Sequence, residues 1–111
     1  MALLPNHAKA QLDVSKLRDY CLSDTHPRGR HKARVFYAAL GVTVADAGWL
    51  KLQLLTGLAL NEAEAQQNDM FGQRFKVDMV VSRQSKRTVV RTVWIVKEKS
   101  TSPQFVTCWV L

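Results

Sequence analysis

Cysteines and long apolar runs are scarce in this chain, and each scarcity excludes a class of protein. Its two cysteines, Cys21 and Cys108, form no CxxC pair and have no histidine at metal-ligand spacing, so we expect no zinc site and no other cofactor. Both are expected to pack as buried thiols, and the sequence leaves a disulfide between them open. The longest apolar stretch, residues 49–60, is interrupted by Lys51 and Gln53, so it cannot supply the ~20 residues of a membrane span. We therefore expect a soluble protein without a membrane partner.

Acidic residues are also few, and the charge is unevenly distributed. The 111 residues include nine Asp and Glu against 16 Lys and Arg, which gives a formal charge of +7. Residues 1–41 hold seven basic and three acidic side chains, residues 42–70 one and four, and residues 71–111 eight and two. Two basic blocks that converge in space would form a positive surface suited to phosphate backbones or to an acidic protein partner. The alternative is a basic surface that contacts only water.

The first half of the chain is predicted to be helical. Apolar residues recur at helical spacing over residues 14–22, which indicates a short helix. Pro27 suits the first turn of a helix, so a second helix is expected from about residue 26 or 30 to residue 40, with Gly41 as its stop. A capping-box pattern opens a third helix over residues 43–56.

The second half of the chain is predicted to form strands. From position 71 to 81 apolar and polar residues alternate, which puts position 71 on the buried side with the other apolar residues. Further strands are expected over residues 87–97 and 105–111, with a short fourth strand near residues 58–63. The expected fold class is α+β, with two to three N-terminal helices packed on a C-terminal three- or four-stranded antiparallel sheet. Residues 1–111 are expected to form a single domain.

The best candidate site is the segment from residue 26 to residue 32, which combines two imidazoles with three cations near a helix start. Free backbone N–H groups at such a start attract anions. We expect His26 and His31 to act as acid and base in catalysis, while Arg28, Arg30 and Lys32 bind phosphate. In the alternative interpretation His26 caps the helix, His31 contacts water and the cations confer solubility.

A second cluster of polar side chains is expected on the sheet, where neighbouring strands would bring them together at a nucleic-acid-binding surface. Its members are Gln73, Arg74, Lys76, Arg91, Thr92 and Thr107. Arg91 shares one side of the predicted strand with Val89 and Val93. Its charge would therefore lie among apolar side chains and requires a partner such as Asp78. A pair of Arg91 with Asp78 that braces the sheet is therefore as good an interpretation as a phosphate contact.

The remaining motifs are uninformative or missing. Trp49, Trp94 and Trp109 could stack on bases, but their spacing is more typical of core residues. The sequence has no Gly-rich phosphate loop, GxSxG elbow or HExxH motif, which argues against nucleotide hydrolysis, esterase and metalloprotease activity.

Several short blocks occur in a recognisable order along residues 4–111. They include Leu4-Pro5-Asn6, His26-Pro27 with Gly29, His31-Lys32-Ala33, Phe71-Gly72-Gln73, Val77-Asp78 and Val90-Arg91-Thr92 with Trp94. Together they resemble a bacterial family of unknown function, whose members occur alone and as C-terminal domains of large secreted haemagglutinin-type or phage-associated proteins. That placement implies a polymorphic-toxin tip, and helices followed by an antiparallel sheet look like the barnase, EndoU, colicin and RelE ribonuclease group.

The leading hypothesis is a metal-independent ribonuclease-like toxin domain that acts on RNA. The alternatives are a non-catalytic module that binds nucleic acid or an acidic partner protein, and an accessory domain that stabilises a larger assembly. The toxin hypothesis implies RNA as the substrate and an acidic immunity or antitoxin protein as a partner. Residues 1–10 lack a charged region followed by an apolar run, so no secretory signal is expected. We expect action in the cytoplasm, after delivery as part of a larger exported protein.

Overall fold

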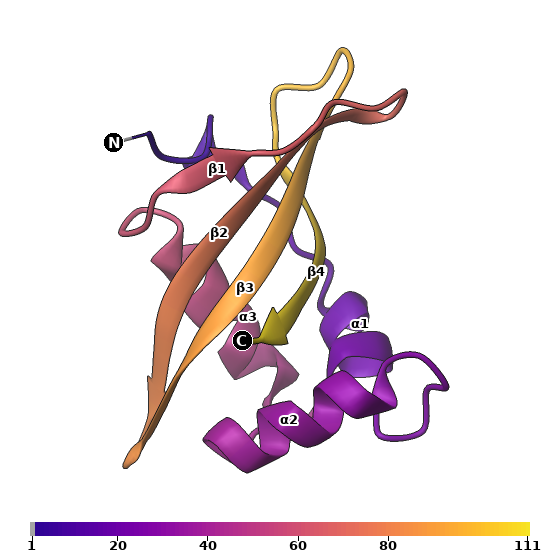
Figure 1. The fold of residues 1–111 in the computed structure, drawn as a ribbon, viewed down its shortest axis with the longest axis vertical. Coiled ribbons are helices and arrows are strands. Elements are labelled where there is room, and N and C mark those ends of the chain that lie inside the picture. Colours follow the sequence, from indigo (N-terminus) through magenta and orange to yellow (C-terminus); the bar gives the residue numbers. More distant parts are fainter. Residues whose placement is uncertain (1) are drawn as a thin grey trace.

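A computed structural model describes residues 2–111 and has helices in the first half of the chain and a sheet in the second (Figure 1). The order of elements confirms the predicted α+β fold. The helical elements are η1 (His7–Lys9), α1 (Val14–Lys16), η2 (Leu17–Cys21), α2 (Arg30–Leu40), η3 (Val44–Asp46) and α3 (Ala47–Gly57). The strands are β1 (Ala63–Ala65), β2 (Gly72–Arg83), β3 (Lys86–Lys97) and β4 (Gln104–Val110).

The helix boundaries follow local signals in the sequence. The Asp13 side chain accepts a 2.9 Å hydrogen bond from the Ser15 N–H and caps α1. The predicted first helix is present, but its second part, η2, is π-helical. Gly41 ends α2 as predicted, with a φ of 68° that glycine adopts at little cost. Pro27 was predicted in the first turn of α2, but it lies in the turn before it, because α2 begins only at Arg30.

The four strands form one antiparallel sheet in the order β1-β2-β3-β4. β2 and β3 make a long hairpin through the residues 84–85, where Gln84 adopts a φ of 54°. The predicted fourth strand exists, but its position near residues 58–63 was wrong. Leu58 instead follows α3 and is buried in the core, and β1 begins at Ala63.

The two faces of the sheet differ sharply. Val77, Met79 and Val81 of β2 are buried on the face that the helices cover, as their alternation predicts, and α3 lies behind the sheet in Figure 1. Asp78 lies on the opposite face. Phe71 was predicted to be buried with the apolar residues of β2, but its side chain is 62% exposed. The reason is that β2 begins only at Gly72, and Phe71 belongs to the preceding turn.

The core lies between the helices and the covered face of the sheet. Its largest side chains are Trp94 of β3, Phe36 of α2 and Phe105 of β4, and all three are buried. Trp94 meets Phe105 edge to face, with 5.3 Å between ring centroids. The N-terminal segment joins the same layer, since Gln11 forms a parallel bridge to Gln104 of β4.

Within residues 2–111 no single helix combines the length and apolarity needed to cross a membrane. The stretches Arg30–Leu40 and Val44–Gly57 reach that length only together, with a 75° bend between them.

Candidate functional site

The side chain of Lys32, on α2, is held where that helix meets η2 and β4. Its Nζ donates a 3.2 Å hydrogen bond to Oγ1 of Thr107. The same ammonium group lies 5.1 Å from the ring centroid of Tyr20 and 5.1 Å from that of Trp109. Both distances are within the range of a cation–π interaction. Lys32 is therefore a positioned cation between two aromatic rings and is not a freely rotating surface lysine.

Two open cavities share Lys32 as a wall. The first has a volume of about 380 Å³ and is lined by His31, Lys32, Val35, Trp109 and Val110. The second has a volume of about 320 Å³ and is lined by Lys16, Tyr20, Lys32, Val106 and Thr107. We call the two together the Lys32 groove. It combines cations, aromatic rings and an exposed imidazole at the edge of the sheet.

The imidazole of His26 is used in the structure of the turn before α2. Its Nδ1 accepts hydrogen bonds of 3.0 Å from the backbone N–H groups of Arg28 and Gly29. The ring also packs edge-on against Tyr20, with centroids 4.7 Å apart. His26 therefore caps this turn, in partial agreement with the alternative interpretation, whereas the N-cap residue of α2 itself is Gly29. The backbone N–H groups of Arg28 and Gly29 are occupied by this ring and are not free for an anion.

The other predicted residues of this segment remain accessible. Arg28, Arg30 and His31 are exposed, and Lys32 is half-buried at the groove. Within residues 2–111 no carboxylate lies at ion-pair distance from Arg28, Arg30 or Lys32. Their positive charge is therefore available to a ligand.

The cations predicted to form the sheet cluster, in contrast, are paired. Nε and Nη2 of Arg91 donate hydrogen bonds of 2.8 and 2.9 Å to the two carboxylate oxygens of Asp78, so the predicted bracing pair is confirmed. These bonds from Arg91 hold the pKa of Asp78 below its usual value. Arg74 pairs with Asp69 at 2.8 Å, and Lys76 approaches Glu64 at 3.5 Å.

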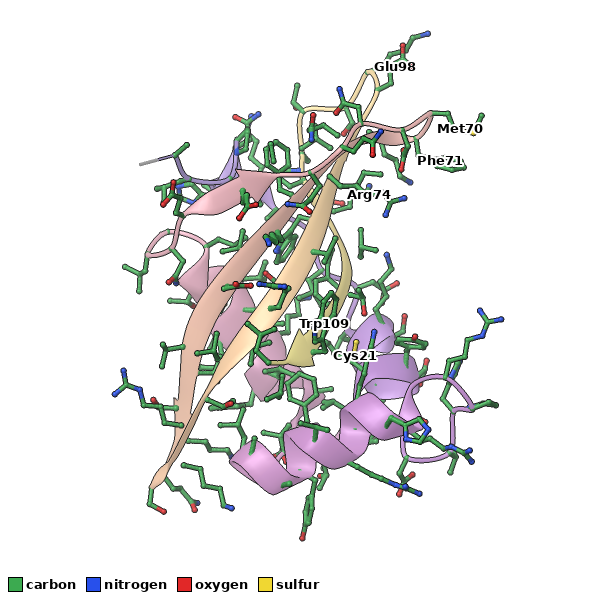
Figure 2. All side chains as sticks on the ribbon, viewed as in Figure 1. Cys21, Met70, Phe71, Arg74, Glu98 and Trp109 are labelled. Atoms are coloured by element: carbon green, nitrogen blue, oxygen red, sulfur yellow. The ribbon has the colours of Figure 1, made fainter. Side chains whose placement is uncertain are left out.

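The predicted sheet cluster is therefore divided in space. Thr107 reaches the Lys32 groove, and Arg91 lies opposite Trp109 in the β3–β4 register without lining either cavity. Arg74 lies toward the end of the sheet away from Trp109 (Figure 2). Beside Arg74, the side-chain amide of Gln73 donates to the Arg74 carbonyl at 2.9 Å. Half of the eight cations in the second basic block are thus paired with carboxylates, and these four do not form a free phosphate-binding surface.

Thr92 was predicted to contact nucleic acid, and its burial corrects that prediction. Its side chain is completely buried on the helix-covered face of β3. Its Oγ1 donates a 2.7 Å hydrogen bond to the Val77 carbonyl and accepts one of 2.8 Å from Nε1 of Trp94. A hydroxyl is needed here because the indole N–H has no access to water.

Replacing Thr92 by valine is expected to lower the free energy of unfolding by about 1–3 kcal/mol, because two buried polar groups lose their partner. Thr92→Ser is the matched control, since it keeps the hydroxyl and should retain more of the stability. Urea unfolding measures both variants. A Thr92→Val protein as stable as the parent would contradict this role.

Sequence reasoning missed Tyr20 and placed Trp109 in the core. Trp94 is in the core as expected, but Trp109 is only half-buried and forms a wall of the groove. The two-residue period of a strand could have predicted part of this site, because Thr107 and Trp109 are two residues apart and so share one face of β4. Their meeting with Lys32 depends on how α2 packs, which no local pattern specifies.

The fold and the groove define a basic α+β domain with a positioned cation, Lys32, where α2 meets the edge of the sheet. A family model described as a domain of unknown function, DUF6883, matches residues 3–111, and the chain belongs to this family. The predicted membership of a family of unknown function is thereby confirmed. No curated protein and no solved structure matches the chain. Among residues 2–111 no three His, Cys, Asp or Glu side chains are grouped so that they could hold a metal ion.

Proposed function

We propose that this domain is a metal-independent ribonuclease-like toxin domain that binds RNA in the Lys32 groove. The observation that carries the proposal is the position of Lys32, between the rings of Tyr20 and Trp109 and next to the exposed His31. A cation held in place can receive a phosphate without first losing side-chain freedom, which favours binding. Aromatic walls beside it offer surfaces on which an unpaired base can stack.

RNA carries its own nucleophile, which limits what the protein must supply. The ribose 2′-hydroxyl attacks the neighbouring phosphorus, and the bond to the 5′-oxygen breaks. We assign proton transfer to His31, charge stabilisation on the phosphate to Lys32, and binding of flanking phosphates to Arg28 and Arg30. His26 is the second proton-transfer candidate, through the ring nitrogen that does not accept the backbone bonds.

The toxin part of the proposal rests on the resemblance to C-terminal domains of large exported proteins. On that basis we propose action in the cytoplasm of a target cell, after delivery. An acidic immunity or antitoxin protein would then neutralise the domain by covering its unpaired cations, Arg28, Arg30 and Lys32.

A second candidate function is a non-catalytic module that binds nucleic acid or an acidic protein. The observation that favours it is the capping role of His26, whose Nδ1 is occupied by two backbone N–H groups. Acid–base cleavage needs one group to remove a proton and another to supply one. If His26 serves only the turn, His31 lacks a second imidazole partner.

RNA binding is expected to weaken steeply as salt rises, because phosphate contacts release counterions. Lys32→Ala should weaken binding to all sequences and reduce the slope of log affinity against log salt by about one. Lys97→Ala is the matched control and should bind like the parent. It removes an exposed cation next to Glu98, at the end of the molecule far from Trp109 (Figure 2). Fluorescence anisotropy with single-stranded RNA measures these changes. Absence of binding at about 50 mM salt, where screening is weak, would remove both nucleic-acid proposals.

A further inference from the structure

The two cysteines lie far apart in sequence and close together beneath the Lys32 groove. Cys21 ends η2 and Cys108 lies in β4, and their exposed fractions are 1% and 0%. Both thiols are free. Sγ of Cys21 is 3.7 Å from Oγ1 of Thr107, the same oxygen that accepts the hydrogen bond from Lys32. Cys108 follows Thr107 in β4 and belongs to the same buried cluster as Cys21, so the contact of Cys21 with Thr107 brings the two cysteines near each other.

We propose that Cys21 and Cys108 are a redox pair, in which Cys21 attacks a low-molecular-weight disulfide and Cys108 completes a disulfide that joins η2 to β4. The proposal does not depend on RNA binding or cleavage. It assigns a chemical role to two buried nucleophiles that the proposed function leaves unused.

The surroundings of the two sulfur atoms make them unequal. The hydrogen bond from Cys108 lowers the pKa of Cys21 to about 6, and the nearby charge of Lys32 acts in the same direction. Burial raises the pKa of Cys108 well above its ordinary value. Since the thiolate is the attacking species, Cys21 reacts first at neutral pH.

The position of each cysteine supports the same order of events. Cys21 contacts Thr107, which lines the wall of an open cavity, and because Cys21 is itself buried its reaction requires the side chains around that cavity to move. Cys108 lies opposite the buried Thr92 in the β3–β4 register and faces the core. An oxidant therefore meets Cys21 before it can meet Cys108.

The reaction balances in two exchange steps with oxidised glutathione. The Cys21 thiolate attacks one sulfur of the oxidant, which forms a mixed disulfide and releases one glutathione thiolate. Cys108 then gives its proton to that thiolate and attacks the Cys21 sulfur, which releases the second glutathione as a thiolate. This thiolate takes from water the proton that Cys21 released when it ionised. The protein loses two hydrogens in total, and one oxidised glutathione becomes two reduced ones.

Incubation of the reduced protein with oxidised glutathione at neutral pH tests the pairing. The expected product has lost two hydrogens by intact-mass spectrometry and cannot be alkylated after denaturation. Cys108→Ser should stop at the mixed disulfide and carry one glutathionyl group on Cys21. Cys21→Ser should carry none. Two alkylatable thiols in the treated parent would overturn the proposal, and an adduct on Cys108 in Cys21→Ser would overturn the assigned order.

A second measurement uses the parent protein alone and does not depend on the folding of either variant. A bond between residues 21 and 108 closes a long loop, which restricts the unfolded chain. The oxidised protein should melt roughly 10 °C or more above the reduced protein. Dithiothreitol should reverse the shift. An oxidised form that melts no higher than the reduced form would show that the native fold does not accommodate the bond, contrary to the proposal.

Discussion

His31→Ala is expected to keep its fold and lose about 100-fold or more of the RNA cleavage rate. His31 is exposed on α2 and, together with Trp109, lines the first of the two cavities of the Lys32 groove. Substituting a side chain of this kind usually changes stability by within about ±0.5 kcal/mol, so loss of cleavage would report on chemistry and not on folding. The measurement is cleavage of mixed cellular RNA in EDTA, with circular dichroism to check the fold.

The control for His31→Ala is His7→Ala, which removes another histidine from η1 and should leave cleavage unchanged. His26→Ala is a weaker test, because loss of its two cap hydrogen bonds acts on the turn as well. Equal cleavage by the parent and His31→Ala would refute the role of His31. No cleavage by the parent would favour the binding module.

Gly29→Ala is expected to destabilise the protein by roughly 1–3 kcal/mol, the usual cost of overpacking. Gly29 has an ordinary φ of −88°, so space is its constraint and not backbone conformation. A Cβ there would lie 2.1 Å from the carbonyl oxygen of Tyr20, and backbone atoms cannot yield as a side-chain tip can. The turn that carries His26 would have to move away from η2.

The matched control is Gly48→Ala in α3, where an added Cβ meets nothing within 4 Å. It should raise the free energy of unfolding by up to about 1 kcal/mol, because alanine favours helix over glycine. Urea titrations of both variants measure the two opposite shifts. If Gly29→Ala unfolds at the same urea concentration as the parent, the close packing of this turn on η2 is wrong.

Local signals explain how much of the fold could be predicted. Gly41 and the Thr43–Asp46 capping box depend on neighbours within four residues, and the structure contains both. The alternation over Val77, Met79 and Val81 similarly depends only on the period of a strand. The π-helical form of η2 carries no such local mark, and it was not predicted.

The candidate site was predicted less well, because it depends on contacts between distant segments. The sequence pointed to Lys32 and His31 through charge and residue type alone. Tyr20 and Trp109 became part of the site only through the packing of η2 and β4 around α2. Likewise, charge counts could not show that Asp69 and Glu64, from the acidic middle of the chain, would pair with Arg74 and Lys76 of β2.

The bridge from Gln11 to Gln104 and the contact of Lys32 with Trp109 connect the beginning of the domain to its final strand. On a ribosome the N-terminal helices emerge first, but the wall formed by β4 emerges last. A nascent chain therefore cannot assemble the Lys32 groove until residue 110 has left the exit tunnel. Premature termination of translation before that point would yield a product without the site.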